Sequence, residues 1–243
     1  MKAVILAGGK GTRLAPYTTV LPKPLMPVGG GMAILELLIR QLKSAGIVDL
    51  TLAVGYLAHL IEAVIGDGGK YGVGVKYSRE DRPMGTAGPI TPVIAEMGED
   101  FLVMNGDLLT NIRFDRLVRH HRDTRADATI AVFRRRIDID FGLIEMDDDG
   151  FMTGYREKPK LDHFVSMGLY VLKRDAVAPF LTPGSYLDMP DLVRQMASAG
   201  RRVACFREDC FWLDIGRHED YEAANAILET RLDEFLPPES ARG

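Results

Sequence analysis

A glycine-rich segment near the amino terminus carries the clearest chemical signal in the chain. Residues 6–14 read Leu-Ala-Gly-Gly-Lys-Gly-Thr-Arg-Leu and overlap the end of a short apolar run, residues 2–7. Glycines allow the backbone to reach φ > 0 and to bring its N–H groups close to an anion, and Lys10 and Arg13 add positive charge there. We therefore expect this segment to bind the phosphates of a polyanionic ligand.

Two familiar phosphate-binding loops do not match this segment. The P-loop needs a lysine directly before its Ser or Thr, whereas Thr12 follows Gly11. The dinucleotide fingerprint Gly-x-Gly-x-x-Gly starts at Gly9 but has Leu14 at its last glycine position. The segment is therefore a phosphate loop of another kind.

Two further side chains, Lys23 and Asp107, stand where they could take part in ligand chemistry. Lys23 stands between Pro22 and Pro24, which restrict the backbone on both sides and fix where the ammonium group points. Asp107 comes soon after a buried run, and α/β sheets place ligand chemistry just past the carboxyl ends of strands. We expect the only tryptophan, Trp212, to pack so that it positions the loop that follows it.

Other clusters favour simpler interpretations. Residues 138–140, Asp-Ile-Asp, match the metal motif of nucleotide-sugar glycosyltransferases, but they follow no central buried strand, which favours a solvated loop. Residues 147–150, Asp-Asp-Asp-Gly, lack the EF-hand spacing and indicate a hairpin turn. The five histidines form no pattern typical of catalysis, and no Gly-x-Ser-x-Gly nucleophile elbow occurs.

The glycine segment followed by Pro22-Lys23-Pro24 resembles the signature of the sugar-1-phosphate nucleotidylyltransferases. The resemblance continues in order along residues 2 to about 228. The later matching segments are Gly85-Thr86-Ala87-Gly88, Asn105-Gly106-Asp107, Phe141-Gly142, Glu157-Lys158-Pro159, Ser166-Met167-Gly168-Leu169-Tyr170 and Trp212-Leu213-Asp214-Ile215-Gly216. Ser166 stands where the family commonly has Asn, which leaves one polar contact to the sugar open.

The resemblance implies a role for each matching residue. It makes Arg13, Lys23 and Lys158 catalytic, and it makes Asp107 and Asp214 the ligands of Mg²⁺. The implied nucleotide-binding residues are Leu6, Gly8, Gly9, Gly11, Thr12, Gly85 and Thr86. The implied sugar-binding residues are Gly142, Glu157 and Ser166.

The implied reaction transfers a nucleotidyl group from a nucleoside triphosphate to a sugar 1-phosphate and releases pyrophosphate. The attacking phosphate is already an anion near neutral pH, so no protein base is required, and catalysis would depend on positioning and electrostatics. Lys23 would stabilise the α-phosphoryl transition state, Arg13 the leaving pyrophosphate, and Lys158 would hold the sugar phosphate. Two alternatives stay open: a non-catalytic regulatory homologue that binds nucleotide sugar, and a transferase with a non-sugar phosphate acceptor.

Glu80 bears on the choice of base, because it stands where thymidylyl relatives place an amide against the pyrimidine. An ionised carboxylate only accepts hydrogen bonds. Guanine presents two neighbouring donors to such a group, whereas thymine and uracil present a carbonyl that would face it badly. We therefore favour GTP, with ATP, CTP, UTP and dTTP as alternatives, and with a solvent-facing Glu80 as the competing interpretation.

The elements that must position these residues alternate between strands and helices. This order predicts an α/β fold with a Rossmann-like, mixed, mostly parallel sheet flanked by helices. The expected strands are 2–7, 50–54, 73–77, 101–104, 128–133, 142–146, 152–156, 165–172 and 202–206, and the expected helices are 32–44, 57–65, 187–199 and 218–232, with another starting near Thr86. We expect a single domain over 1–243, with 1–110 mainly nucleotide-binding, 111–232 a β-rich and mainly sugar-binding part, and 236–243 a tail.

Composition and charge argue against binding to nucleic acid or to a membrane. The chain has 243 residues and a net charge of −4, without the broad positive field that indicates nucleic-acid binding. Its apolar runs are too short to cross a bilayer, and the first of them ends too early for a secretory signal. Two cysteines in a chain of this length are typical of the reducing cytosol. We expect a cytoplasmic enzyme whose partners are an NTP and a sugar 1-phosphate, with no nucleic acid and no membrane, and a homo-oligomer stays open.

Overall fold

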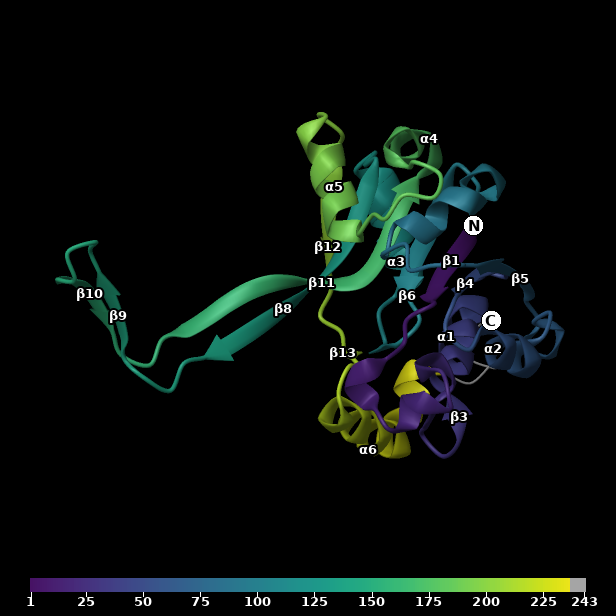
Figure 1. Cartoon of the computed structure of the whole chain (residues 1–243), viewed down its shortest axis with the longest axis horizontal. Helices are drawn as coiled ribbons and strands as arrows, with labels where there is room; N and C mark the ends of the chain where they lie inside the picture. The colour runs from purple at the N-terminus through teal and green to yellow at the C-terminus, as the bar shows by residue number, and fades with distance from the viewer. Residues whose placement is uncertain (237–243) are drawn as a thin grey trace.

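A seven-stranded sheet of order β12-β8-β11-β6-β1-β4-β5 forms the centre of the protein (Figure 1). The computed structural model describes residues 1–236. β11 runs antiparallel to its neighbours β6 and β8, and the other neighbouring strands of the sheet are parallel. The strands are β1 (Lys2–Ala7), β4 (Asp49–Val54), β5 (Gly74–Arg79), β6 (Asp100–Asn105), β8 (Ala128–Asp138), β11 (Lys160–Lys173) and β12 (Val203–Arg207). The predicted mixed, mostly parallel sheet is confirmed.

Helices cover both faces of this sheet, which is why its central strands are apolar on both sides. One face packs against α1 (Ile34–Ser44), α2 (Ala58–Ile65) and α3 (Phe114–Asp123). The other face packs against a 3₁₀ segment (Gly88–Glu96), α4 (Arg174–Val177) and α5 (Met189–Ser198). Successive side chains of β1 point to opposite faces of the sheet. Ile5 packs in the first core and Val4 in the second, and both are fully buried.

A third apolar cluster supports the loops that follow β1. Helix α6 (His218–Phe235) packs there through Ala224, Leu228 and Phe235. Leu14, which ends the glycine segment, is fully buried in the same cluster. The glycine segment is therefore anchored through Leu14 to the cluster that contains helix α6.

Three short two-stranded ladders lie outside the large sheet. They are β2 (Pro27–Val28) with β3 (Met32–Ala33), β7 (Leu108–Thr110) with β13 (Trp212–Asp214), and β9 (Leu143–Met146) with β10 (Met152–Arg156). Only the last was predicted, together with the turn at residues 147–150 that joins its strands. The other two ladders have strands too short to show a hydrophobic period.

Two further expectations need correction. The helix expected from Thr86 is a 3₁₀ segment that starts at Gly88, because Pro89 and Pro92 have no N–H for α-helical hydrogen bonds. The last helix continues past the expected residue 232 to Phe235. Of the expected tail, residues 237–243 lie outside the described residues.

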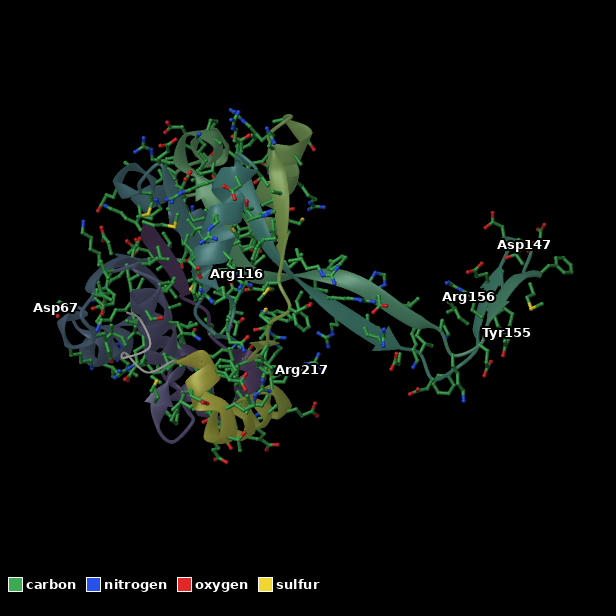
Figure 2. All side chains as sticks on the ribbon, turned by 180° about the vertical axis from the view of Figure 1, so that it is seen from behind. Asp67, Arg116, Asp147, Tyr155, Arg156 and Arg217 are labelled. Carbon is green, nitrogen blue, oxygen red and sulfur yellow. The ribbon has the colours of Figure 1, made fainter. Side chains whose placement is uncertain are left out.

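β8 and β11 are longer than expected and leave the body as a paired ribbon. Their pairing runs without interruption from Ser166↔Val132 to Lys160↔Asp138, and the β9–β10 hairpin continues beyond it. We call residues 134–164 the arm. Both views show the arm extending far from the rest of the protein, with the hairpin at its tip (Figures 1 and 2).

Among the described residues, none of the helices combines the length and apolar character needed to cross a bilayer.

Candidate active site

The carboxyl ends of the parallel strands gather most of the candidate side chains. β1 leads into the glycine segment, β5 is followed by Glu80, and Asp107 lies just past β6. After β1 the chain forms β4 and β5 on one side of β1, and then β6 on its other side. Such a reversal of strand order opens a crevice where open α/β sheets bind ligands. The candidate site lies in this crevice.

The glycine segment lines a small cavity in the crevice. Gly11 has a φ of 62°, and its carbonyl accepts a hydrogen bond of 2.9 Å from the hydroxyl of Thr18. A Cβ atom at Gly11 would come within 3.2 Å of Cβ of Lys23, so the loop needs glycine there. The cavity measures about 280 Å³ and is lined by Leu6, Ala7, Gly9, Gly11, Thr12, Arg13, Lys23, Pro24, Gly106 and Asp107. A larger hollow of about 540 Å³ at the root of the arm contains none of the predicted site residues.

Lys23 is a buried cation held by two carboxylates. Its side chain is 8% exposed, and its Nζ lies 2.5 Å from Oδ2 of Asp107 and 3.9 Å from Oδ1 of Asp214. Burial raises the pKa of Asp214, and the nearby charge of Asp107 adds to the rise, while Lys23 opposes it. Charges in such a partly desolvated cluster interact more strongly than they would in water.

The β7–β13 ladder sets the spacing between the two carboxylates. β7 begins immediately after Asp107, and Asp214 is the last residue of β13, paired with the first residue of β7. The N–H of Ile215 donates to the carbonyl of Asp107 at 3.1 Å. Residues far apart in sequence are therefore fastened together through their backbones.

Arg13 approaches the same cluster from the glycine segment. Its guanidinium lies against Gly216, where an added Cβ atom would come within 3.1 Å of Nη2. The side chain is exposed to solvent, so its donors are open to an incoming anion. The structure thus brings together the predicted charged residues of the phosphate and metal site: Arg13, Lys23, Asp107 and Asp214.

Asp107 and Asp214 suit a hard divalent cation. Oδ1 of Asp107 is buried and has no hydrogen-bond partner among the described atoms, so an acceptor is left for a ligand. Within residues 1–236, no group of three or more Asp, Glu, His or Cys side chains forms a metal cage. Mg²⁺ commonly binds one or two carboxylates together with substrate phosphates. The two carboxylates fit that mode of binding.

Glu80 points toward the glycine segment. Its Oε2 accepts a hydrogen bond of 3.2 Å from the N–H of Met84, and a Cβ atom at Gly8 would come within 2.6 Å of its Oε1. Burial raises the pKa of Glu80, and the hydrogen bond from Met84 opposes that rise. The carboxylate is therefore held against the loop that lines the crevice.

Gly85 and Thr86 dock against the start of α5. An added Cβ atom at Gly85, whose φ is 79°, would overlap the carbonyl of Leu187. The N–H and the hydroxyl of Thr86 donate to Oδ1 of Asp188 at 3.0 and 3.2 Å. Asp188 thus holds the segment in place, and the nucleotide-binding role of Gly85 and Thr86 stays a prediction.

The predicted sugar-binding residues fall into two places. Ser166 lies at the root of the arm, where its Oγ is 2.9 Å from the hydroxyl of Tyr170. The adjoining Gly168 packs on the side chain of Asn105 at the end of β6, because a Cβ atom there would come within 2.5 Å of Nδ2 of Asn105. Ser166 therefore lies close to the end of the strand that precedes Asp107.

Gly142, Glu157 and Lys158 lie on the arm, and the structure does not bring them to Lys23. The hydroxyl of Tyr155 donates to Oε2 of Glu157 at 2.7 Å and lies against Gly142. Lys158 has a φ of 41°, a conformation that costs a lysine about 1–3 kcal/mol and is common at functional sites. The sugar-binding and catalytic roles of these residues stay predictions.

Trp212 fastens the root of the arm. Its Nε1 donates to the carbonyl of Met167 at 3.0 Å, and its ring centroid lies 5.4 Å from that of Phe133 on β8. It stands on β13, so it connects the arm to the strand that carries Asp214.

Sequence reasoning missed two supporting side chains. Tyr155 precedes Glu157 by two residues, a spacing that places both on one face of an extended strand and could have indicated the contact. Asp188 gave no local signal, because its partner Thr86 is 102 residues away.

The fold and the site define an α/β protein with a glycine-rich loop, a buried lysine and paired carboxylates at the switch point of its sheet. The sequence model of the nucleotidyl transferase family matches residues 2–231, and the chain belongs to that family.

Curated relatives align along most of the chain. The mannose-1-phosphate guanylyltransferase of Mycobacterium tuberculosis is 32% identical over 232 residues, which cover 93% of this chain and 64% of that protein. The glucose-1-phosphate thymidylyltransferase of Streptomyces griseus is 34% identical over 240 residues, which cover 95% of this chain and 67% of that protein. The chain thus spans about two thirds of the length of these relatives.

A solved structure shares the fold. It is that of a putative glucose-1-phosphate thymidylyltransferase from Bacillus anthracis, with a TM-score of 0.76 at 24% sequence identity. The match covers 95% of this chain and 96% of the other.

Proposed function

We propose that this protein transfers a nucleotidyl group from a nucleoside triphosphate to a sugar 1-phosphate. The observation that carries the proposal is the buried Lys23, held between Asp107 and Asp214 beside the glycine segment at the switch point of the sheet. Membership in the nucleotidyl transferase family supports it, and so do the activities named for both curated relatives.

The reaction joins an oxygen of the sugar phosphate to the α-phosphorus as the bond from that phosphorus to the β-phosphate oxygen breaks. Pyrophosphate leaves with the electron pair of the broken bond, and no protein proton transfer is needed. Lys23 stabilises charge at the α-phosphoryl group, and the exposed guanidinium of Arg13 binds the leaving pyrophosphate. Lys158 holds the attacking phosphate. Mg²⁺, bound by Asp107 and Asp214, would neutralise phosphate charge.

We propose GTP as the nucleotide substrate. The carboxylate of Glu80 is held against Gly8 by burial and by the Met84 N–H, rather than directed to solvent. It can accept from the ring N–H and the amino group of guanine, whereas it opposes the carbonyl of thymine or uracil. Leaving such a polar edge unpaired costs roughly 1–3 kcal/mol. One relative is named a guanylyltransferase and the other a thymidylyltransferase, so the names of the relatives alone do not identify the base.

One panel of substrates tests the proposal. Purified protein is assayed with five nucleoside triphosphates, mannose 1-phosphate and glucose 1-phosphate, and pyrophosphate release is measured with and without Mg²⁺. We expect Mg²⁺-dependent release with GTP well above the other nucleotides. A preference for dTTP or UTP would contradict the role of Glu80 and leave the reaction standing. Nucleotide binding by calorimetry without any pyrophosphate release would favour the regulatory alternative.

A further inference from the structure

One face of the hairpin at the tip of the arm is apolar and uncovered. Ile144 and Tyr155 are paired across the strands, and so are Met146 and Met152, which places these four side chains on the same face. They are 53%, 56%, 67% and 66% exposed, respectively. The opposite face carries the ion pair between Glu145 and Arg156. The hairpin is thus amphipathic, with a contiguous exposed apolar patch of a kind that marks an interaction surface.

Among the described residues, the hairpin makes no hydrogen bond or ion pair with the body. Within the described part of the chain, all hydrogen bonds and ion pairs of residues 139–159 join them to each other. A two-stranded hairpin alone is marginally stable in water. Burial of the apolar face against another surface would therefore stabilise it.

The apolar face is linked to the sugar-binding residues of the arm. Tyr155 belongs to this face, and its hydroxyl donates to Glu157 while lying against Gly142. Whatever surface covers Tyr155 consequently lies close to Glu157 and Lys158. If that surface borders a nucleotide site, the sugar-binding residues of the arm lie next to the bound nucleotide.

The nucleotide site of the same chain is out of reach. At about 3.3 Å per residue, residues 134–138 of β8 carry the hairpin roughly 16 Å beyond the body. The pairing with β11 along this stretch is continuous, and Trp212 and Phe133 hold its root. Figure 2 shows Tyr155 and Arg156 far from Arg217, which lines a hollow together with Arg13.

A receiving surface exists beside the nucleotide site. Tyr17 and Val20 are 54% and 76% exposed, and both lie on the segment between Arg13 and Lys23. Large apolar side chains next to a phosphate loop provide a rim on which an apolar hairpin can pack.

We propose that two copies of this chain exchange arms, so that the arm of each copy completes the sugar side of the other's nucleotide site. The hairpin face of Ile144, Met146, Met152 and Tyr155 packs near Tyr17 and Val20 of the second copy. Glu157 and Lys158 then face the Lys23–Asp107–Asp214 cluster of that copy. The exchange is reciprocal, so it forms a closed two-fold pair. This inference rests on the proposed function of the site.

Paired variants decide whether the arm acts between copies. Two chains with different tags are co-expressed, and dimers carrying both tags are purified through the two tags in turn. A dimer of Lys23→Ala with Lys158→Ala chains contains one site with an intact body and an intact arm, so we expect about half of the wild-type pyrophosphate release. A dimer of wild type with the double variant contains no such site, so we expect almost none.

If each arm instead completes the nucleotide site of its own chain, the results expected for the two pairs are reversed. The first pair would then be inactive and the second would keep about half of the activity. That pattern, or the failure to recover any dimer carrying both tags, would overturn the proposal.

Sedimentation separates failure of the exchange from failure of the proposed function. We expect the wild-type chain to sediment as a dimer, and the Ile144→Asp and Met152→Asp variants as folded monomers by circular dichroism. Val64→Asp, the same kind of change at a 43% exposed position on α2, is the matched control and should stay dimeric. A monomeric wild type, or a dimer that survives both hairpin changes, would overturn the exchange. A hairpin-dependent dimer that releases no pyrophosphate would retain the exchange and refute the function.

Discussion

Lys23 and Lys158, both assigned to phosphate chemistry, are held in opposite ways. Lys23 is buried between two carboxylates at the edge of the large sheet. Lys158 is exposed on the arm, and within residues 1–236 its side chain makes no hydrogen bond or ion pair. The predicted phosphate-binding group of the body is therefore held in place by its neighbours, whereas the predicted sugar-binding groups of the arm are not.

The difference follows from the two kinds of sheet. Parallel strands end at one edge, so the loops after β1, β5 and β6 converge without further help. A two-stranded ribbon has no second layer, so its side chains have only each other for support. The comparison predicts that a change at Lys23 alters both stability and turnover, whereas a change at Lys158 alters turnover alone.

The largest effect is expected from removing either lysine. Lys23→Ala and Lys158→Ala should each lower the turnover number by about 10²-fold or more, because each removes charge from the transition state. Only Lys23→Ala should also lower the free energy of unfolding, by roughly 1–2 kcal/mol. That loss is smaller than for a fully buried pair, because Asp107 and Asp214 are partly exposed. Pyrophosphate release and urea unfolding measure the two quantities.

Lys76→Ala serves as the control for both lysines. Lys76 is exposed and pairs with Glu96 on the surface, so neither turnover nor stability should change measurably. Near-normal turnover in a folded Lys23→Ala or Lys158→Ala variant would remove that residue from the catalytic group.

A smaller effect is expected from the carboxylates. Asp107→Asn and Asp214→Asn should each raise the Mg²⁺ concentration needed for half-maximal activity by about tenfold, because Mg²⁺ binds carboxylates more strongly than amides. Asp138→Asn changes the solvated Asp-x-Asp segment of the arm and should leave the metal titration unchanged. An unchanged titration in either body variant would exclude that residue from metal binding.

A change at Glu80 should alter the choice of nucleotide more than the rate. Glu80→Gln introduces a donor next to the base, so we expect the ratio of kcat/KM for GTP to that for UTP to fall by about tenfold. Asp81→Asn, the adjacent and exposed carboxylate, is the matched control. Equal ratios in the two variants would show that backbone groups read the base.

The smallest effect concerns a buried histidine of the body and an exposed one of the arm. Burial lowers the pKa of His121, although Asp100 opposes the shift. The unfolded chain therefore takes up the proton first, and stability should decline as the pH falls below about 6.5. His121→Gln should remove part of this decline, as measured by urea unfolding at pH 7.5 and pH 5, whereas His163→Gln on the arm should not. Identical pH dependence in wild type and His121→Gln would contradict this prediction.

Much of the site could be predicted from local sequence. The glycine segment and Asp107 each stand just past the end of a strand whose apolar run is visible in the sequence, and parallel strands end together. Lys23 follows no strand, but the prolines on both sides of it mark it in the sequence. The contact between Asp107 and Asp214 could not be predicted in this way, because β7 and β13 are only three residues long and pair across the chain. The contact of Thr86 with Asp188 could not be predicted either, because the two residues are 102 positions apart in the sequence.

The sequence by itself determined the order of the strands of the large sheet and of helices α1, α2, α5 and α6, the family and the identity of the charged groups, because these depend on local pattern and residue type. Only the tertiary structure decided that Lys23 is buried between Asp107 and Asp214, and that Gly142, Glu157 and Lys158 leave the body on an arm. β8 and β11 extend beyond the expected residues because they pair with each other along the arm. The alternation of side chains within one strand does not show how far its pairing with another strand continues.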